Sequence, residues 1–432
     1  MSQRMPQRTR TIAFFPEASF GAALNCIGIA QALRELGARP VFICHAHFQG
    51  IFAEYGFAEY PLQLDSPLSA ADHQHYWERF IERNVPYFDQ PPLAQIDSYV
   101  APAWEAIIDT AIESEKPLQQ LLARLKPDAI VLDNVVSFPA IAAAGCPWVR
   151  MVSCAETELP DAAVPPYLSG ASSSDAQASA SYREHYLQAT KPAHERFARF
   201  LAECGHPALP AGQFLEDSPW LNLLLSPTPV RYEREQPLPA ERFLYLDGCV
   251  RSEAPYIPPQ FPRHDDAPLI YVSFGSLGAA DVAMMKQLID AVAQLPYRFL
   301  INVGAYREHY DTVPDNVYLD SWYPQPAVLR ECQLFIHHGG NNSFCEALYF
   351  GLPSVIIPYC WDGHDNARRA DEVGVARYLP RFEKPLAALP TALAELLADQ
   401  AMAQRLSAVR EQMQASRGTE AAARAILGIC TN

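Results

Sequence analysis

The chain has 432 residues, of which 49% are hydrophobic and 19% are charged. This length is sufficient for two domains of about 200 residues, each with its own core. The formal net charge of −16 argues against nucleic acid or an anionic membrane as a bulk partner, because both bind a basic face.

The cysteines and the apolar runs predict the cellular setting. The ten cysteines contain no CxxC pair, which is typical of reduced cytosolic thiols. The apolar run after the basic N-terminus is too short for a signal peptide, and no stretch approaches the roughly 18 apolar residues of a membrane span. We therefore expect a cytoplasmic protein.

The first 44 residues predict the start of a parallel sheet. Residues 10–15 have the pattern of a strand, 22–36 that of an amphipathic helix, and 40–44 that of a second strand. A strand, a helix and a strand joined by short turns form a right-handed βαβ unit. The loop 16–21 after the first strand should then face the crevice in which such sheets bind ligands.

The alternation of helices and strands continues through the N-terminal half. The predicted elements are a short helix and turn at 48–61, helices at 117–125, 138–144 and 191–204, and strands at 128–132, 148–152, 221–225 and 243–246. The Ser/Ala-rich run 169–181 predicts a mobile surface loop. Between 66 and 111 the pattern loosens and aromatic residues accumulate, among them Tyr76, Trp77, Phe80 and Phe88. Their side chains could form a helical core or line an apolar small-molecule pocket, and both interpretations stay open.

A change in composition marks the domain boundary. Residues 251–268 carry five prolines, which is typical of an extended, semi-rigid linker. A new strand at 269–274 then opens a second α/β unit. We predict an N-terminal domain over 1–250, a C-terminal domain over 269–418, and a final helical segment, 419–432, that can pack on either domain.

The stretch 316–378 carries the most specific chemistry. Residues 334–338, LFIHH, read as a buried strand that leads into Gly339-Gly340, where the backbone can turn tightly and approach a ligand. A helix begins at Asn341-Asn342-Ser343 and stops at Gly351, and a strand follows at 354–357. A strand that feeds a Gly-rich turn and a helix N-terminus binds anions, because unpaired N–H groups and the helix dipole face one point. We therefore predict a phosphate or diphosphate ligand.

The order of residues in this stretch resembles the donor signature of family-one, UDP-glycosyltransferase-like enzymes of the bacterial natural-product type. The matching residues are Ser321-Trp322-Tyr323-Pro324-Gln325, His338 to Ser343, Glu346, Gly351-Leu352-Pro353, and Asp362 with Asn366-Ala367. They extend over roughly 45 residues, which is far more specific than a lone Gly-rich loop. The resemblance implies the α/β GT-B fold, in which two Rossmann-like domains with parallel sheets face each other across a cleft. The final helix then returns to the first domain.

The resemblance also implies the site residues. The donor-binding residues would be Ser276, Trp322, Gln325, His338, Gly340, Asn342, Ser343, Glu346 and Asp362. Trp322 would stack on the nucleobase, Glu346 would accept from the ribose hydroxyls, and Asp362 would contact the donor sugar. A ribose with both hydroxyls favours UDP or GDP over a deoxyribose nucleotide. In this family the aromatic-rich region, with Tyr76, Trp77, Phe80 and Phe88, holds the acceptor-binding loops.

Two departures from the family pattern concern the chemistry. The family has Gly-His in the first loop, where its His is the base that deprotonates the acceptor, but this chain has Gly21-Ala22. Asp133 matches the Asp that orients that His, and a desolvated carboxylate can itself act as a base. The candidate bases are Asp133, Glu17 and His45, although Asp133 could instead cap the following turn. The second departure is Gly363 in place of Gln after the sugar-binding Asp, which argues against glucose as the sugar.

These observations predict an inverting, metal-independent transferase that moves a sugar from a nucleotide diphosphate, UDP by preference, to an apolar small molecule. The acceptor could carry an acidic or anionic nucleophile that needs little base. No Asp-x-Asp motif accompanies the donor region, so neither a metal nor a cofactor besides the nucleotide sugar is implied. A non-catalytic, donor-binding auxiliary subunit is the alternative, and an epimerase or hydrolase of the same fold is a further one.

Overall fold

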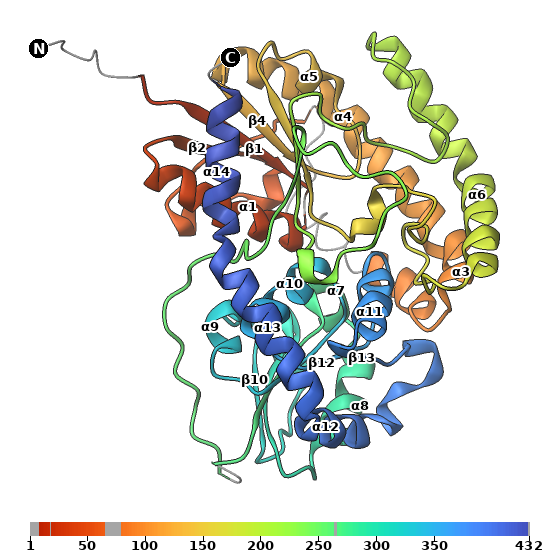
Figure 1. The fold of residues 1–432 in the computed structure, drawn as a ribbon, viewed down its shortest axis with the longest axis vertical. Helices are drawn as coiled ribbons and strands as arrows, with labels where there is room; N and C mark the ends of the chain where they lie inside the picture. The colour runs from red at the N-terminus through yellow and green to blue at the C-terminus, as the bar shows by residue number, and fades with distance from the viewer. Residues whose placement is uncertain (1–7, 18, 65–78, 263–265, 431–432) are drawn as a thin grey trace, which may run out of the picture.

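The computed structural model describes residues 8–17, 19–64, 79–262 and 266–430. The chain forms two parallel α/β units placed one beyond the other along the long axis of the molecule (Figure 1). All strand pairs in both sheets are parallel. The fold class predicted from the sequence is therefore confirmed.

The first sheet has seven strands in the order β3-β2-β1-β4-β5-β6-β7. Its strands are β1 (Thr11–Pro16), β2 (Arg39–Cys44), β3 (Ala58–Pro61), β4 (Ala129–Asp133), β5 (Trp148–Val152), β6 (Leu221–Leu224) and β7 (Phe243–Tyr245). Its helices are α1 (Phe20–Glu35), α3 (Pro92–Gln95), α4 (Ala101–Leu125), α5 (Pro139–Ala142) and α6 (Ala176–Glu203). The strand order reverses between β1 and β4, so the crevice that binds ligands in such sheets opens where these two strands end.

The second sheet has six strands in the order β10-β9-β8-β11-β12-β13. Its strands are β8 (Leu269–Ser273), β9 (Arg298–Asn302), β10 (Val317–Asp320), β11 (Leu334–His337), β12 (Ser354–Ile356) and β13 (Ala376–Tyr378). Its helices are α7 (Gly275–Ala279), α8 (Val282–Val292), α9 (Gln325–Leu329), α10 (Asn341–Phe350), α11 (Gly363–Glu372), α12 (Leu389–Ala398) and α13 (Gln400–Ser416). Here the order reverses between β8 and β11, and Ser273 pairs with His337 at their carboxyl ends.

The last helix, α14 (Gly418–Ile429), returns to the first sheet and lies along α1 (Figure 1). Ala422, Ala423 and Ile426 are fully buried in the same apolar cluster as Ile12 of β1. Gly418 makes this return possible, because a Cβ there would lie 1.9 Å from the carbonyl oxygen of Asp247. Among the described residues, no helix combines the length and the apolar character needed to cross a bilayer.

Two local predictions were only partly right. The run 169–181 was expected to be a mobile surface loop. Residues 169–175 form a loop, in which Ser172 and Ser173 both donate hydrogen bonds to Glu372, but Asp175 caps α6, which begins at Ala176. Alanine has the highest helix propensity, so this composition suits a capped helix as well as a loop. The segment 48–61, expected to be a helix and turn, contains 3-10 turns and then the edge strand β3.

Candidate active site

The turn between β11 and α10 has the geometry of an anion site. Gly339 has a φ of +87°, and a Cβ there would lie 2.5 Å from the carbonyl oxygen of Gly363, so no larger residue fits without a shift. Gly340 is the N-cap of α10. The backbone N–H of Asn341 donates to Asp362 Oδ2 at 3.3 Å, so this helix start faces a carboxyl oxygen.

His338 lies between this turn and the one that follows β8. Gly275, with a φ of +67°, approaches the ring so closely that a Cβ would lie 3.2 Å from Cε1 of His338. The His338 ring stacks on Tyr359, and its Nδ1 atom makes no hydrogen bond among the described residues. Burial lowers the pKa of His338 to about 4, so the ring is neutral at pH 7. The neighbouring Ser276 is exposed.

The residues assigned to the nucleoside lie on one side of α10. Gln325, the first residue of α9, donates to Ser343 Oγ at 3.1 Å and to Glu346 Oε2 at 2.7 Å. Trp322 is 49% exposed, although it is a large aromatic residue, as a stacking platform requires. The Glu346 side chain is only 1% exposed and also pairs with Arg251. Arg251 was not singled out from the sequence, where it is merely the first residue of the Pro-rich linker.

Asp362 lies at the N-terminus of α11, directly after the strained residue Trp361, which has a φ of +55°. Burial raises the pKa of Asp362 to about 7, and the nearby Asp365 carboxylate adds to this rise. The Asn366 amide ties this region to the Gly-Gly turn, since it donates to the Gly339 carbonyl oxygen at 2.9 Å and to Asp362 Oδ2 at 3.4 Å. A carboxyl group with a pKa near neutral pH is thus placed beside the helix start.

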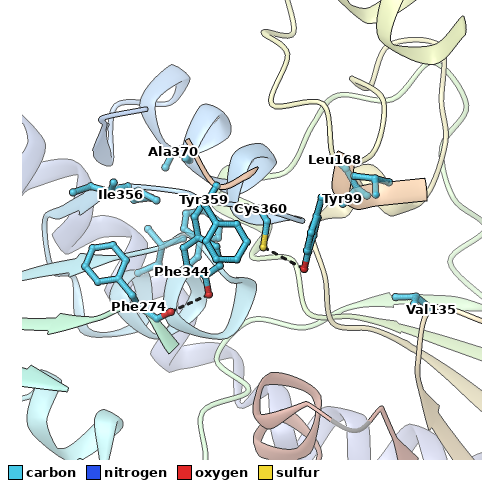
Figure 2. Close-up of a cluster of buried hydrophobic side chains, with 14 of the residues drawn as sticks. Tyr99, Val135, Leu168, Phe274, Phe344, Ile356, Tyr359, Cys360 and Ala370 are labelled. Atoms are coloured by element: carbon cyan, nitrogen blue, oxygen red, sulfur yellow. Dashed lines mark hydrogen bonds between the residues drawn. The ribbon is translucent and has the colours of Figure 1, made fainter. Parts of the chain in front are cut away.

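The two domains meet over an apolar cluster beside Asp362 (Figure 2). Tyr99 of the first domain lies against the 359–360 segment of the second, and the Cys360 thiol donates to its hydroxyl at 3.6 Å. The Tyr359 hydroxyl donates to the carbonyl oxygen of Phe274 at 3.0 Å, which fixes this segment to the turn after β8. The loop that carries Asp362 is therefore held by both domains.

Two of the three predicted bases come together on the first domain. Pro16 pairs with Asp133 in the sheet register, so Glu17 follows at the same edge, and its backbone N–H donates to the Asp133 carbonyl oxygen at 2.7 Å. Ser153, directly after β5, donates its hydroxyl to Asp133 Oδ1. Burial raises the pKa of Asp133 well above its usual range, and burial also raises the pKa of Glu17. His45 lies after β2, on the other side of β1, and packs near Phe15 with 5.9 Å between ring centroids.

Glu158 was missed by the sequence analysis. Burial is the largest cause of the raised pKa of both Asp133 and Asp362, and the charge of Glu158 is a smaller one, which comes after Glu17 for Asp133 and after Asp365 for Asp362. Arg150 of β5 holds Glu158 at 2.5 Å and Asp217 at 2.7 Å. An arginine within the apolar strand WVRMV was the available signal, because a buried cation requires a carboxylate partner.

The structure describes only two of the four predicted acceptor residues, and these two differ in burial. Tyr76 and Trp77 lie outside the described residues. Phe80 is partly buried against the main core, whereas Phe88 is fully buried and packs on Tyr359 with 4.8 Å between ring centroids. The position of Phe88 agrees with the core-packing interpretation of this region.

A second group of aromatic rings lies next to Asp362. Trp361, next to Asp362, approaches Trp104 with 5.6 Å between ring centroids and Tyr167 with 6.2 Å. Trp104 in turn stacks on Phe214 with 4.1 Å between ring centroids. These rings come from both domains and surround the Asp362 loop.

Part of the chain matches known proteins in sequence. A family described as "Erythromycin biosynthesis protein CIII-like, C-terminal domain" matches residues 286–426. The NDP-glycosyltransferase YjiC of Bacillus subtilis (strain 168) is 32% identical over 161 residues, which cover 37% of this chain and 41% of that protein. The oleandomycin glycosyltransferase of Streptomyces antibioticus is 30% identical over 158 residues, or 36% of this chain and 37% of the relative. The chain thus matches about two fifths of the length of such relatives.

Solved structures match the whole fold. The glycosyltransferase of kitacinnamycin superposes with a TM-score of 0.70 at 20% identity, covering 98% of this chain and 100% of the other. The calicheamicin glycosyltransferase CalG4 gives a TM-score of 0.65 at 18% identity, covering 98% and 99%. The fold class is therefore GT-B. Part of the chain is similar in sequence to bacterial enzymes named as NDP-glycosyltransferase and oleandomycin glycosyltransferase.

Proposed function

We propose that the protein is an inverting glycosyltransferase that moves a sugar from a nucleoside diphosphate to an apolar small molecule. One observation carries the proposal: the Gly-Gly turn at the start of α10, with Asp362 beside it, lies on one domain, and the buried carboxyl group of Asp133 lies at the end of β4 on the other. A diphosphate site and a buried base on opposite domains are the two parts that sugar transfer requires.

The donor would bind along α10. Trp322 would stack on the base, and the N–H groups at the helix start, together with Ser276 and neutral His338, would bind the diphosphate. These dipoles stabilise the leaving group by themselves, so the proposed reaction needs no metal. Asp362 would bind hydroxyls of the sugar. The sequence favours UDP as the nucleotide, through the assignment of both ribose hydroxyls to Glu346.

Asp133 would act as the base. The acceptor hydroxyl gives its proton to an oxygen of Asp133, and its own oxygen attacks the anomeric carbon from the face opposite the leaving group. The bond from that carbon to the diphosphate breaks, and the nucleoside diphosphate leaves with the electron pair. Burial makes Asp133 a stronger base than an exposed aspartate, and the Ser153 hydroxyl fixes the direction of its carboxylate. Trp361 and Tyr167, which are only partly buried beside Asp362, would contact an apolar acceptor.

The first test is thermal stabilisation by UDP, dTDP, GDP and their sugar conjugates, because a ligand of the native state raises the melting temperature. We expect a shift with at least one nucleoside diphosphate; no shift with any of them would refute the donor site. Release of the diphosphate is then followed with a panel of phenolic and carboxylic acceptors. Binding without turnover on any acceptor would favour the auxiliary-subunit alternative, and turnover without an acceptor would indicate hydrolysis.

Asp133→Asn tests the base. The amide keeps the size and one acceptor oxygen but cannot take the proton, so we expect turnover to fall by about 100-fold or more, with unchanged affinity for the nucleotide. Asp217→Asn is the control, because Asp217 is an aspartate of the same domain whose side chain is 47% exposed and pairs with Arg150 rather than with Asp133 or Ser153. An Asp133→Asn protein with full activity would remove Asp133 from the mechanism.

A further inference from the structure

Helix α11 carries a further buried carboxyl group, that of Asp365, one helical turn after Asp362. Its oxygens accept three buried hydrogen bonds from the first domain: the Thr157 hydroxyl donates to Oδ2 at 2.6 Å, the Leu168 N–H to Oδ2 at 2.7 Å, and the Gly170 N–H to Oδ1 at 2.7 Å. A buried carboxylate requires such partners, because its charge has lost contact with water. Asp365 therefore joins the two domains next to the residue assigned to the donor sugar.

The backbone around the Asp365 carboxylate has an uncommon conformation. Leu168 has a φ of +67° and Gly170 a φ of +55°. A positive φ is disfavoured for a residue with a Cβ, so the conformation of Leu168 needs compensation from its surroundings. The turn directs both N–H groups at one carboxylate, as concave backbone sites for anions do. A Cβ at Gly170 would lie 3.0 Å from the Cβ of His364, so the turn also packs directly on α11. Its conformation thus depends on the second domain.

This turn belongs to the segment 153–170, which follows β5 and passes both halves of the candidate site. At its start, the Ser153 hydroxyl donates to the Asp133 carboxyl group. Near its end, the Tyr167 ring approaches Trp361 with 6.2 Å between ring centroids. The carboxylate on α11 binds the backbone directly after Tyr167, so it fixes where this ring lies relative to Trp361.

We propose that Asp365 is a positioning residue for acceptor binding: it holds the segment 153–170 so that Tyr167 lies beside Trp361, where an apolar acceptor would bind. This inference rests on the proposed function and extends it, because it makes the acceptor site dependent on contact between the two domains. Asp365 acts through the segment and does not touch the reacting atoms. In this respect it differs from Asp362, which would bind the sugar itself.

Amide hydrogen exchange at pH 8 tests the contact without any substrate. Burial raises the pKa of Asp365 to about 6, so the group is ionised at this pH. Asp365→Asn keeps the size of the side chain, but its NH2 group cannot accept from the N–H donors. We expect faster exchange of the Leu168 and Gly170 amides in the variant and unchanged exchange in β4. Equal exchange of these two amides in both proteins would overturn the proposal.

Turnover kinetics then test the role in acceptor binding. For Asp365→Asn we expect the acceptor KM to rise about tenfold or more, the value of one hydrogen bond to a charged group, with an unchanged Kd for the nucleoside diphosphate. Thr157→Val removes one donor with little change in shape, so it should raise KM less, and it replaces the Asn variant should that protein not fold. Glu372→Gln is the matched control. Glu372 also lies on α11, but it accepts from Ser172 and Ser173, beyond the segment and in an exposed position, so KM should stay near the wild-type value.

An unchanged acceptor KM in the folded variants would refute the proposal. An equal loss of affinity for acceptor and nucleotide would also refute it, because that result indicates a general structural defect. Absence of turnover by the wild-type protein with every acceptor would instead be a failure of the proposed function, and the exchange comparison would then decide whether Asp365 orders the segment 153–170.

Discussion

Asp362→Asn should stabilise the protein at neutral and alkaline pH, although it alters a residue assigned to substrate. Asp362 is buried, and its pKa rises from an ordinary value near 3.8 to about 7. The folded protein therefore holds a proton that the unfolded chain has already lost between these two pH values. For such a group, stability is highest below the unfolded pKa and falls as the pH rises through the folded pKa.

The magnitude follows from the difference in pKa. A difference of about three corresponds to about 4 kcal/mol, of which about 3 kcal/mol is lost between pH 5 and pH 8. Asparagine carries no charge, and its oxygen can still accept from the Asn341 N–H and the Asn366 amide. The free energy of unfolding of the variant relative to the wild type should therefore rise by about 3 kcal/mol from pH 5 to pH 8.

Urea unfolding, followed by tryptophan fluorescence at pH 5, 6, 7 and 8 and at constant ionic strength, measures this difference. Asp290→Asn is the matched control, because Asp290 is exposed on α8, and the difference from wild type should then stay constant with pH. Parallel pH profiles for the wild type and Asp362→Asn would refute the reasoning. They would mean that Asp362 ionises in the folded protein as easily as in the unfolded chain, so that burial and the charge of Asp365 do not raise its pKa.

Two further changes separate stability from binding. Gly339→Ala places a Cβ at a φ of +87° and 2.5 Å from the Gly363 carbonyl oxygen. The substitution should therefore lower the free energy of unfolding by about 1–3 kcal/mol and weaken diphosphate binding. A melting temperature equal to that of the wild type would contradict this close approach. Trp322→Ala should leave the melting temperature of the free protein nearly unchanged, because the side chain is half exposed, but should weaken nucleotide binding by about 1–3 kcal/mol. Unchanged affinity in calorimetry would remove Trp322 as the base platform.

Much of the donor site was predictable because its parts are close in sequence. The strand, the Gly-Gly turn and the helix N-terminus of residues 334–350 are adjacent in the chain, and the chemistry of the turn follows from φ angles that only glycine adopts easily. The first βαβ unit was predictable for the same reason. The extents of α4 and α6 were not, since both continue through a proline, at Pro117 and Pro192.

The arrangement of the candidate base residues could not be predicted, because it depends on contacts between segments that are distant in the sequence. Glu17 and Asp133 come together only because β1 pairs with β4 in a register that aligns Pro16 with Asp133. The charge of Arg150 within a buried strand indicates that it has a carboxylate partner, but the sequence does not identify this partner as Glu158.

The sequence by itself determined the two α/β units and the anion-binding turn, because periodicity, glycine positions and helix starts act over a few residues. Only the tertiary structure decided which carboxyl groups share the interface, how far burial raises the pKa values of Asp133 and Asp362, and that Arg251 reaches Glu346. These properties depend on removal of charges from water and on the position of one domain against the other, and neither is encoded locally.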